Sequence, residues 1–130
     1  INNIESVNFK GRLDFYDYFH VLYNADVLLM IRNNSLFANT GFPFKLGEYL
    51  ATGNVVISTR VSDVKYYLEN RKNAILVDPE NQEQLYNAMK YCITNKEDAY
   101  RIGQEGIKVC QKYFNPDINS EKFYQLLRRV

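Results

Sequence analysis

Short continuous apolar runs alternate along this chain with longer stretches in which apolar residues are spaced three and four positions apart. A short apolar run is typical of a strand buried on both faces, whereas the wider spacing is typical of a helix. The apolar runs predict strands over residues 26–31, 54–58 and 74–77. Alternation of apolar and polar residues predicts a further strand over residues 6–11, which ends at a glycine.

The helical spacing occupies the segments between these strands and continues to the end of the chain. Helices are expected over residues 14–23, 44–52, 63–68, 81–93, 96–114 and 118–130. Pro43 fits the start of the second of these helices, Gly53 can take the left-handed backbone angle that ends it, and Asn81 is expected to cap the fourth. Four strands alternating with helices predict one α/β domain with a parallel sheet and a helical tail.

Composition narrows the possible partners. Lys and Arg total 16 against 15 Asp and Glu, a formal charge of +1, so no net field attracts nucleic acid. The two cysteines, Cys92 and Cys110, and the single histidine, His20, match no metal-binding spacing. We therefore expect these three side chains to serve packing or to lie at the surface, and we expect neither a metal nor a cofactor.

No apolar run approaches the ~18 residues that a membrane span needs, and no signal-peptide core is present. A cytoplasmic location is therefore expected. Because the chain begins at Ile1 rather than at Met, we expect it to start inside a longer protein.

A candidate site lies within residues 39–48, where a polar loop leads into the helix expected over residues 44–52. Amide N–H groups at a helix start have no partner in the helix, and such groups suit phosphate. Lys45 and Glu48 are three residues apart and share one face of this helix. They could instead form a surface ion pair, and that interpretation remains open here. The polar residues that follow the predicted strands favour a ligand site, because parallel sheets bind ligands at the carboxyl ends of their strands.

Three segments, taken in order, resemble the group 1 glycosyltransferases: residues 24–29 (NADVLL), 42–58 (FPFKLGEYLATGNVVIS) and 73–79 (NAILVDP). These are retaining, nucleotide-sugar-dependent enzymes with two Rossmann-like halves, the GT-B fold. The resemblance is to the later part of the C-terminal, donor-binding half. It implies that residues 1–130 form a partial nucleotide-sugar-binding domain, a Rossmann-like parallel sheet flanked by helices.

The same resemblance implies that the first two strands of that half are missing. In the strand order of the family they lie in mid-sheet, between the strands expected at residues 7–9 and 26–31. An exposed strand edge promotes pairing between chains. We therefore expect either a homodimer or a rearrangement near the N-terminus.

Two residue roles follow from a motif of two glutamates separated by seven residues. Glu48 aligns with the second glutamate, and the resemblance implies that its carboxylate accepts hydrogen bonds from the ribose hydroxyls. Thr40 aligns with the first, which faces the transferred sugar in relatives. A neutral hydroxyl at this position would remove a charge that the family places near the reacting carbon.

Further contacts with the donor are implied for residues on either side of this loop. The backbone N–H groups of Gly41 and Phe42 would meet the diphosphate or a sugar hydroxyl, and Lys45 would contact the diphosphate. Residues from Arg32 to Ser35 would border the base. The resemblance identifies no catalytic residue.

The implied function is transfer of a hexose from a nucleotide diphosphate-sugar to a glycan or lipid-linked acceptor, in polysaccharide biosynthesis. Catalysis would be mainly electrostatic, and the lack of an Asp-x-Asp triplet favours metal-free handling of the diphosphate. The longer parent would be the active enzyme, associated peripherally with a membrane, whereas this chain alone would be inactive. The alternative is a non-catalytic α/β module that binds a nucleotide or a partner protein.

Overall fold

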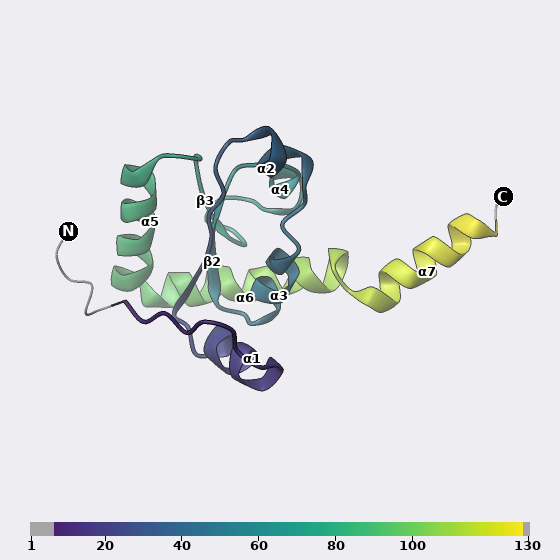
Figure 1. Cartoon of the computed structure of the whole chain (residues 1–130), viewed down its shortest axis with the longest axis horizontal. Coiled ribbons are helices and arrows are strands. Elements are labelled where there is room, and N and C mark those ends of the chain that lie inside the picture. Colours follow the sequence, from purple (N-terminus) through teal and green to yellow (C-terminus); the bar gives the residue numbers. More distant parts are fainter. Residues whose placement is uncertain (1–6, 129–130) are drawn as a thin grey trace.

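The computed structural model describes residues 7–128, which form a three-stranded parallel sheet with helices on both of its faces (Figure 1). Along the chain the elements are α1 (Phe15–Tyr23), β1 (Val27–Met30), α2 (Leu36–Thr40), α3 (Lys45–Ala51), β2 (Val55–Thr59), α4 (Val64–Tyr67), β3 (Ile75–Val77), α5 (Gln82–Thr94), α6 (Lys96–Tyr113) and α7 (Pro116–Leu127). The predicted α/β class is confirmed.

The strands lie in the order β1-β2-β3, and both neighbouring pairs are parallel. At their ends Met30 is paired with Ser58, and Thr59 with Val77. Parallel neighbours need crossover connections, which are supplied here by α2 with α3 and by α4. The carboxyl ends of all three strands therefore meet at one edge of the sheet.

Successive strand residues point to opposite faces of the sheet, which gives the molecule two apolar clusters. One cluster lies between the sheet and the α5–α6 layer. Its buried members are Val55, Ile57, Ile75, Val77, Ala88, Cys92, Ala99 and Ile102. Cys92 is thus a packing residue, as the sequence predicted.

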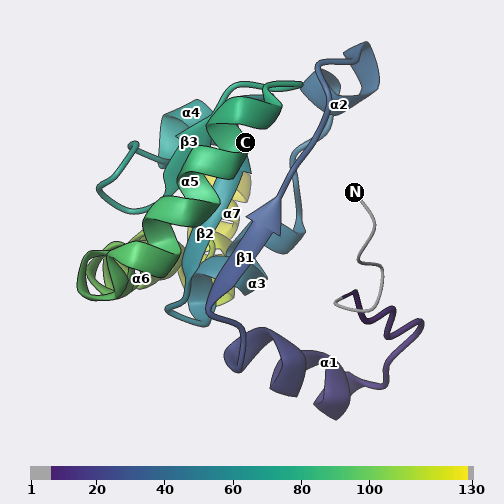
Figure 2. The same cartoon turned by 90° about the vertical axis from the view of Figure 1, so that its left-hand side faces the viewer.

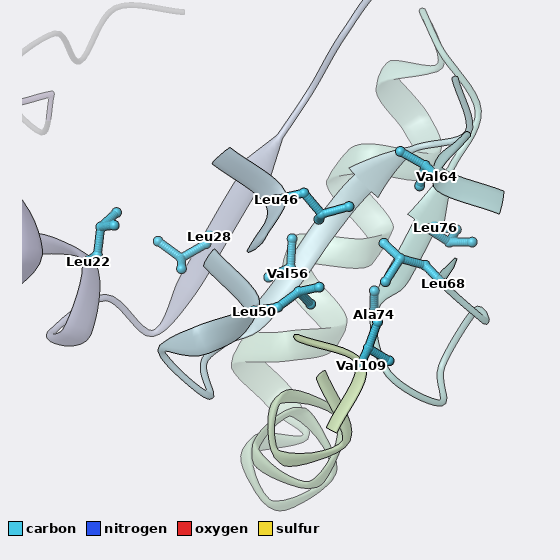
Figure 3. Close-up of a cluster of buried hydrophobic side chains, with 10 residues drawn as sticks. All are labelled: Leu22, Leu28, Leu46, Leu50, Val56, Val64, Leu68, Ala74, Leu76 and Val109. Atoms are coloured by element: carbon cyan, nitrogen blue, oxygen red, sulfur yellow. The ribbon is translucent and has the colours of Figure 1, made fainter. Parts of the chain in front are cut away.

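The second cluster covers the opposite face, where side chains from α1, α3, α4 and α6 meet alternate residues of the strands (Figure 3). Its buried members are Leu22, Leu28, Leu46, Leu50, Val56, Val64, Leu68, Ala74, Leu76 and Val109. Leu46 and Leu50, four residues apart on α3, are 0% and 1% exposed. The predicted packing face of this helix is confirmed, and its opposite face is left for Lys45 and Glu48.

Helix α6 approaches the start of β2 without an intervening side chain. A Cβ atom added at Gly103 would lie 2.1 Å from the carbonyl oxygen of Gly53. At Gly106 an added Cβ would lie 3.0 Å from Leu50 Cδ2 and 3.1 Å from the Asn73 carbonyl oxygen. Glycine at position 103 is therefore what allows the helix to lie this close to the sheet.

The strand predicted over residues 6–11 is wrong where it can be assessed. Residue 6 lies outside the described residues, and residues 7–11 form no strand. Their apolar side chains are exposed, Val7 by 54% and Phe9 by 87%. A strand is held by hydrogen bonds to a neighbour, and within residues 7–128 the edge strand β1 pairs with β2 alone. The alternating pattern by itself could not supply that neighbour.

The last helix starts at Pro116 rather than at the predicted residue 118, and residues 129–130 of the prediction lie outside the described residues. Asn115 caps it by accepting a hydrogen bond from the Asp117 amide at 2.9 Å. Figure 1 shows α7 extending away from the sheet and its helices, and α7 contains no buried residue. The start differs because proline is well tolerated in the first turn of a helix.

Candidate functional site

The candidate site lies at the edge where the three parallel strands end. Arg32, which follows β1, joins two of the segments there. Its backbone N–H donates to Thr59 Oγ1 at the end of β2 (3.0 Å), and its guanidinium Nη1 donates to the carbonyl oxygen of Gly41 (2.5 Å). Arg32 therefore attaches the turn between α2 and α3 to the edge of the sheet.

Residues 39 and 40, expected in a polar loop, instead end the short helix α2, and no element had been predicted for residues 36–38. The exposed Ser35 side chain caps it: Oγ accepts a hydrogen bond from the Ala38 amide (3.2 Å) and donates to Asn33 Oδ1 (2.7 Å). Ser35 therefore has a local structural role. This contact is compatible with the predicted position of the segment beside a nucleotide base.

Thr40 is the last residue of α2 and is exposed. Its hydroxyl donates within the helix, where the carbonyl oxygens of Leu36 and Phe37 lie at 3.1 and 3.3 Å. Because the hydroxyl proton is used locally, Thr40 can offer a ligand only its acceptor lone pairs. This is a narrower role than the sugar contact expected from sequence.

The chain then turns through Gly41, whose backbone is extended, and enters α3 after Phe44. No described side chain caps the first turn of α3. This turn and the loop before it contain the residues predicted to contact a diphosphate, which are Gly41, Phe42 and Lys45. Phe42, by contrast, has its ring packed at 5.5 Å from the Tyr67 ring and 5.6 Å from the Phe114 ring. Only its backbone is suited to the predicted contact.

Glu48 lies on the exposed face of α3 and is bound by a residue that the sequence did not indicate. The hydroxyl of Tyr18, on α1, donates to Glu48 Oε2 at 2.7 Å. Burial of the phenol, together with this hydrogen bond and the nearby carboxylate charge, raises the pKa of Tyr18 above its ordinary value. The hydroxyl therefore stays protonated and remains a donor at neutral pH.

Lys45 also contacts Tyr18. Its Nζ lies 5.9 Å from the centre of the Tyr18 ring, within the range of a cation–π interaction. The ion pairs among the described residues join Arg60 to Asp78, Lys72 to Glu69, Arg101 to Asp98 and Lys108 to Glu105. A Lys45–Glu48 pair, the alternative left open by the spacing, is not among them.

The structure thus arranges the predicted residues in two groups. Arg32 and Gly41 are joined to each other at the strand ends, and Lys45 and Glu48 are joined through Tyr18. A groove of about 730 Å³ runs between α3 and the end of α6. Its lining includes Phe42, Phe44, Glu48, Tyr67 and Phe114.

Sequence reasoning missed Tyr18 and Thr59. Thr59 could have been found, because it ends a buried apolar run at the ligand-binding edge of a parallel sheet. Tyr18 had no comparable signal, since it lies 30 residues from Glu48 within a helix rich in aromatic residues.

Within residues 7–128 no group of three or more His, Cys, Asp or Glu side chains is placed to hold a metal ion. In the same range no helix is both long and apolar enough to cross a membrane.

Comparison with known proteins places this arrangement in a family. The family model described as "Glycosyl transferases group 1" matches residues 1–95, which is most of the chain. The chain belongs to the group 1 glycosyltransferases. The resemblance drawn from the three sequence segments is therefore confirmed. No curated protein matches the sequence.

Solved structures agree with membership of the group 1 glycosyltransferases. Sucrose-phosphate synthase from Thermosynechococcus elongatus is 25% identical, with a TM-score of 0.76 over 96% of this chain and 30% of its own. HepE from Anabaena, in complex with UDP-glucose, is 15% identical, with a TM-score of 0.76 over 85% of this chain and 29% of its own. This group 1 glycosyltransferase chain thus spans about 30% of the length of these two relatives.

A third structure shows which part of the fold is present. The C-terminal domain of LpcC, a group 1 family protein from Francisella tularensis, is 18% identical, with a TM-score of 0.70 over 85% of this chain and 53% of its own. Together with the two relatives above, it confirms that this group 1 glycosyltransferase chain has the fold expected of the C-terminal half of a GT-B enzyme.

Proposed function

We propose that residues 1–130 are the later part of a donor-binding domain, and that this domain binds a nucleotide diphosphate-sugar. The observation that carries the proposal is the exposed Glu48 carboxylate on α3, held by Tyr18 in a group 1 glycosyltransferase domain. A carboxylate oxygen is an acceptor without a proton of its own, which suits a pair of ribose hydroxyls.

Structures of a relative support a nucleotide-sugar as the ligand class. HepE has been solved in complex with UDP-glucose, with UDP and glucose, and with UDP. Its fold matches this chain with TM-scores of 0.76, 0.76 and 0.69 in the three complexes. We extend from that protein only the class of ligand, and we use UDP as the first probe.

The proposed roles are distributed between the segment that follows β1 and helix α3 with the turn before it. Glu48 accepts from the ribose, and the ammonium of Lys45 faces the diphosphate. The backbone amides of Gly41 and Phe42 also meet the diphosphate. Arg32 fits a border position near the base: one of its donors is used by the Gly41 carbonyl, and a guanidinium has five.

Two further residues have narrower proposed roles. Ser35 fixes the start of α2 beside the base, consistent with its cap to the Ala38 amide. Thr40 presents its hydroxyl oxygen as an acceptor towards the transferred sugar, since its proton is used within α2. Because threonine is neutral, this position would bind the sugar without the negative charge that a glutamate would place there.

For the longer protein we propose transfer of a hexose to a glycan or lipid-linked acceptor in polysaccharide biosynthesis, at the cytoplasmic side and in peripheral contact with a membrane. The chain alone is expected to bind donor without transferring sugar. Group transfer also requires an acceptor site, and the chain spans only about 30% of the two relatives above. Helix-terminal amides and Lys45 would stabilise the departing diphosphate electrostatically.

Calorimetric titration of the 130-residue chain with UDP tests the donor site. UDP is expected to bind, and Glu48→Ala is expected to weaken binding by about tenfold or more, because hydrogen bonds to a charged group contribute about 1.5–3 kcal/mol. Glu83→Gln, an exposed glutamate on α5, is the control and should leave the affinity unchanged. Equal affinities for the wild-type and Glu48→Ala chains would contradict the proposal.

A further inference from the structure

One side chain on α1 contacts both charged residues of the α3 face. The Tyr18 hydroxyl donates to Glu48 Oε2 at 2.7 Å, and the Tyr18 ring lies 5.9 Å from Lys45 Nζ. Tyr18 is 30 residues from Glu48 in the chain, so the contact depends on how α1 packs beside α3. A single phenol therefore influences the position of the carboxylate and of the ammonium together.

The contact leaves one carboxylate oxygen for a ligand. Tyr18 occupies Oε2, and no described residue donates to Oε1 of Glu48. The side chain of Glu48 is exposed, as is that of Lys45. An unattached glutamate at such a position would sample several rotamers, and ordering it would reduce the affinity for a ligand. With Oε2 held, Oε1 is already fixed before a ligand arrives.

A direct ion pair between Lys45 and Glu48 would leave the carboxylate less available to a ligand. Lys72–Glu69, Arg101–Asp98 and Lys108–Glu105 are ion pairs between residues three apart in this molecule. Lys45 and Glu48 have the same spacing in the reverse order, with the basic residue first, and their charged groups are each engaged by Tyr18. A direct pair would occupy the carboxylate with the ammonium and reduce what each could offer to a ligand.

Stability gives little reason for the hydrogen bond. Glu48 is exposed and Tyr18 is only half-buried, so water would satisfy the carboxylate if the phenol hydroxyl were absent. The packing contribution of the Tyr18 ring, beside Phe19 at 5.3 Å, does not need the hydroxyl. The hydroxyl is thus the atom that separates a positioning role from a packing role.

We propose that Tyr18 is a positioning residue of the nucleotide-sugar site, whose hydroxyl holds Glu48 with one oxygen free to accept from the ribose and whose ring keeps Lys45 apart from Glu48. This inference rests on the donor site proposed above. It adds a residue from α1, and therefore a contribution of that helix, to a site otherwise formed by α2, α3 and the strand ends.

The test is calorimetric titration of the full 130-residue chain with UDP, using Tyr18→Phe, which keeps the ring and removes the hydroxyl. We expect UDP affinity to fall by about threefold to tenfold, the range expected when one flexible side chain must be ordered on binding. The midpoint of thermal unfolding should remain within about 2 °C of wild type. Tyr16→Phe, the exposed tyrosine two residues earlier on α1, is the matched control and should change neither quantity.

A double-mutant comparison separates positioning from general damage. If Tyr18 acts through Glu48, Tyr18→Phe should weaken UDP binding in the wild-type chain and have no further effect in Glu48→Ala. Equal losses in both backgrounds would overturn the positioning role. A full-affinity Tyr18→Phe chain, with Glu48→Ala impaired, would overturn this inference and leave the proposed donor site intact. Absence of UDP binding to the wild-type chain, or full affinity in Glu48→Ala, would overturn both.

Discussion

The two sides of the sheet differ in how completely they are covered. Every residue of β2 and β3 is buried, and α5 and α6 pack over these two strands. In β1 only Leu28 is buried, and Leu29 is 41% exposed. Figure 2 shows β1 at the border of the sheet, with α5 over its neighbours. β1 and β3 are both edge strands of the sheet. The residues of β2 and β3 are nevertheless all buried, whereas β1 is only partly covered.

The difference shows where local sequence suffices and where it does not. Each of the three apolar runs, that of β1 included, has a paired neighbour in the sheet and forms the strand it predicts. On the β1 side the described residues include no strand beyond β1, and the predicted strand there is unformed over residues 7–11. Arg32 and Thr59 lie at the carboxyl ends of β1 and β2, whereas Tyr18 comes from α1, the helix that leads into the start of β1.

The largest effect is expected from adding a side chain at Gly103, where α6 lies against the backbone at the start of β2. Gly103→Ala would place a Cβ atom 2.1 Å from the Gly53 carbonyl oxygen, so α6 would have to move from β2. We expect the free energy of unfolding, measured in urea, to fall by about 3 kcal/mol. Gln111→Ala, at an exposed position of the same helix, is the control and should stay within about 0.5 kcal/mol of wild type. Similar values for the two variants would show that the close approach does not stabilise the protein.

A second prediction concerns the edge of the β1 side. An uncovered apolar strand edge favours self-association, so we expect the chain to dimerise through β1, as measured by light scattering after size-exclusion chromatography. Leu29→Lys places a charge there and should weaken the dimer by about tenfold, or about 1.4 kcal/mol. Leu36→Lys, an exposed leucine on α2, should leave the dimer unchanged. A wild-type chain that stays monomeric at millimolar concentration would contradict this prediction.

A smaller effect on stability is expected when acid protonates Asp98, on the helix α6 that packs over β2 and β3. Hydrogen bonds from Tyr91 and Arg101 hold the pKa of the Asp98 carboxyl below its usual value of 3.8. A lowered pKa in the folded state stabilises the protein above that usual value, and the contribution is lost as pH falls through the folded pKa. The urea midpoint should therefore decrease between about pH 5 and about pH 3, and less steeply in Asp98→Asn. Asp26→Asn is the control, and a slope for Asp98→Asn equal to that of Asp26→Asn would contradict the assignment.

The smallest effect is expected at the turn after β3. Glu80 has a φ of 61°, in the left-handed region that side chains other than glycine adopt at a cost. Glu80→Gly should raise the free energy of unfolding by about 0.5 kcal/mol, since relief of that cost is partly offset by the greater freedom of glycine in the unfolded chain. Glu83→Gly, three residues later in α5, should instead lower it by about 1 kcal/mol. The opposite signs are measurable by urea unfolding, and the same sign for both variants would contradict the explanation.

The candidate site was predictable in part. The sequence placed Glu48 and Lys45 on the exposed face of a helix behind a turn, and the structure has both exposed on α3. That followed from helical periodicity, which local residues determine. The state of Thr40, whose hydroxyl is used within α2, could not be read from sequence, because no pattern predicted that short helix.

The sequence by itself determined the elements whose formation depends on local spacing: the strands β1, β2 and β3, the helix that carries Glu48, and the cap at Asn81, which accepts a hydrogen bond from the Gln84 amide at 2.9 Å. It also contained the ordered segments that identified the family. Tertiary structure alone decided that residues 7–11 form no strand and that Tyr18, rather than Lys45, binds Glu48. Both outcomes depend on neighbours distant in the chain, whose positions periodicity does not encode.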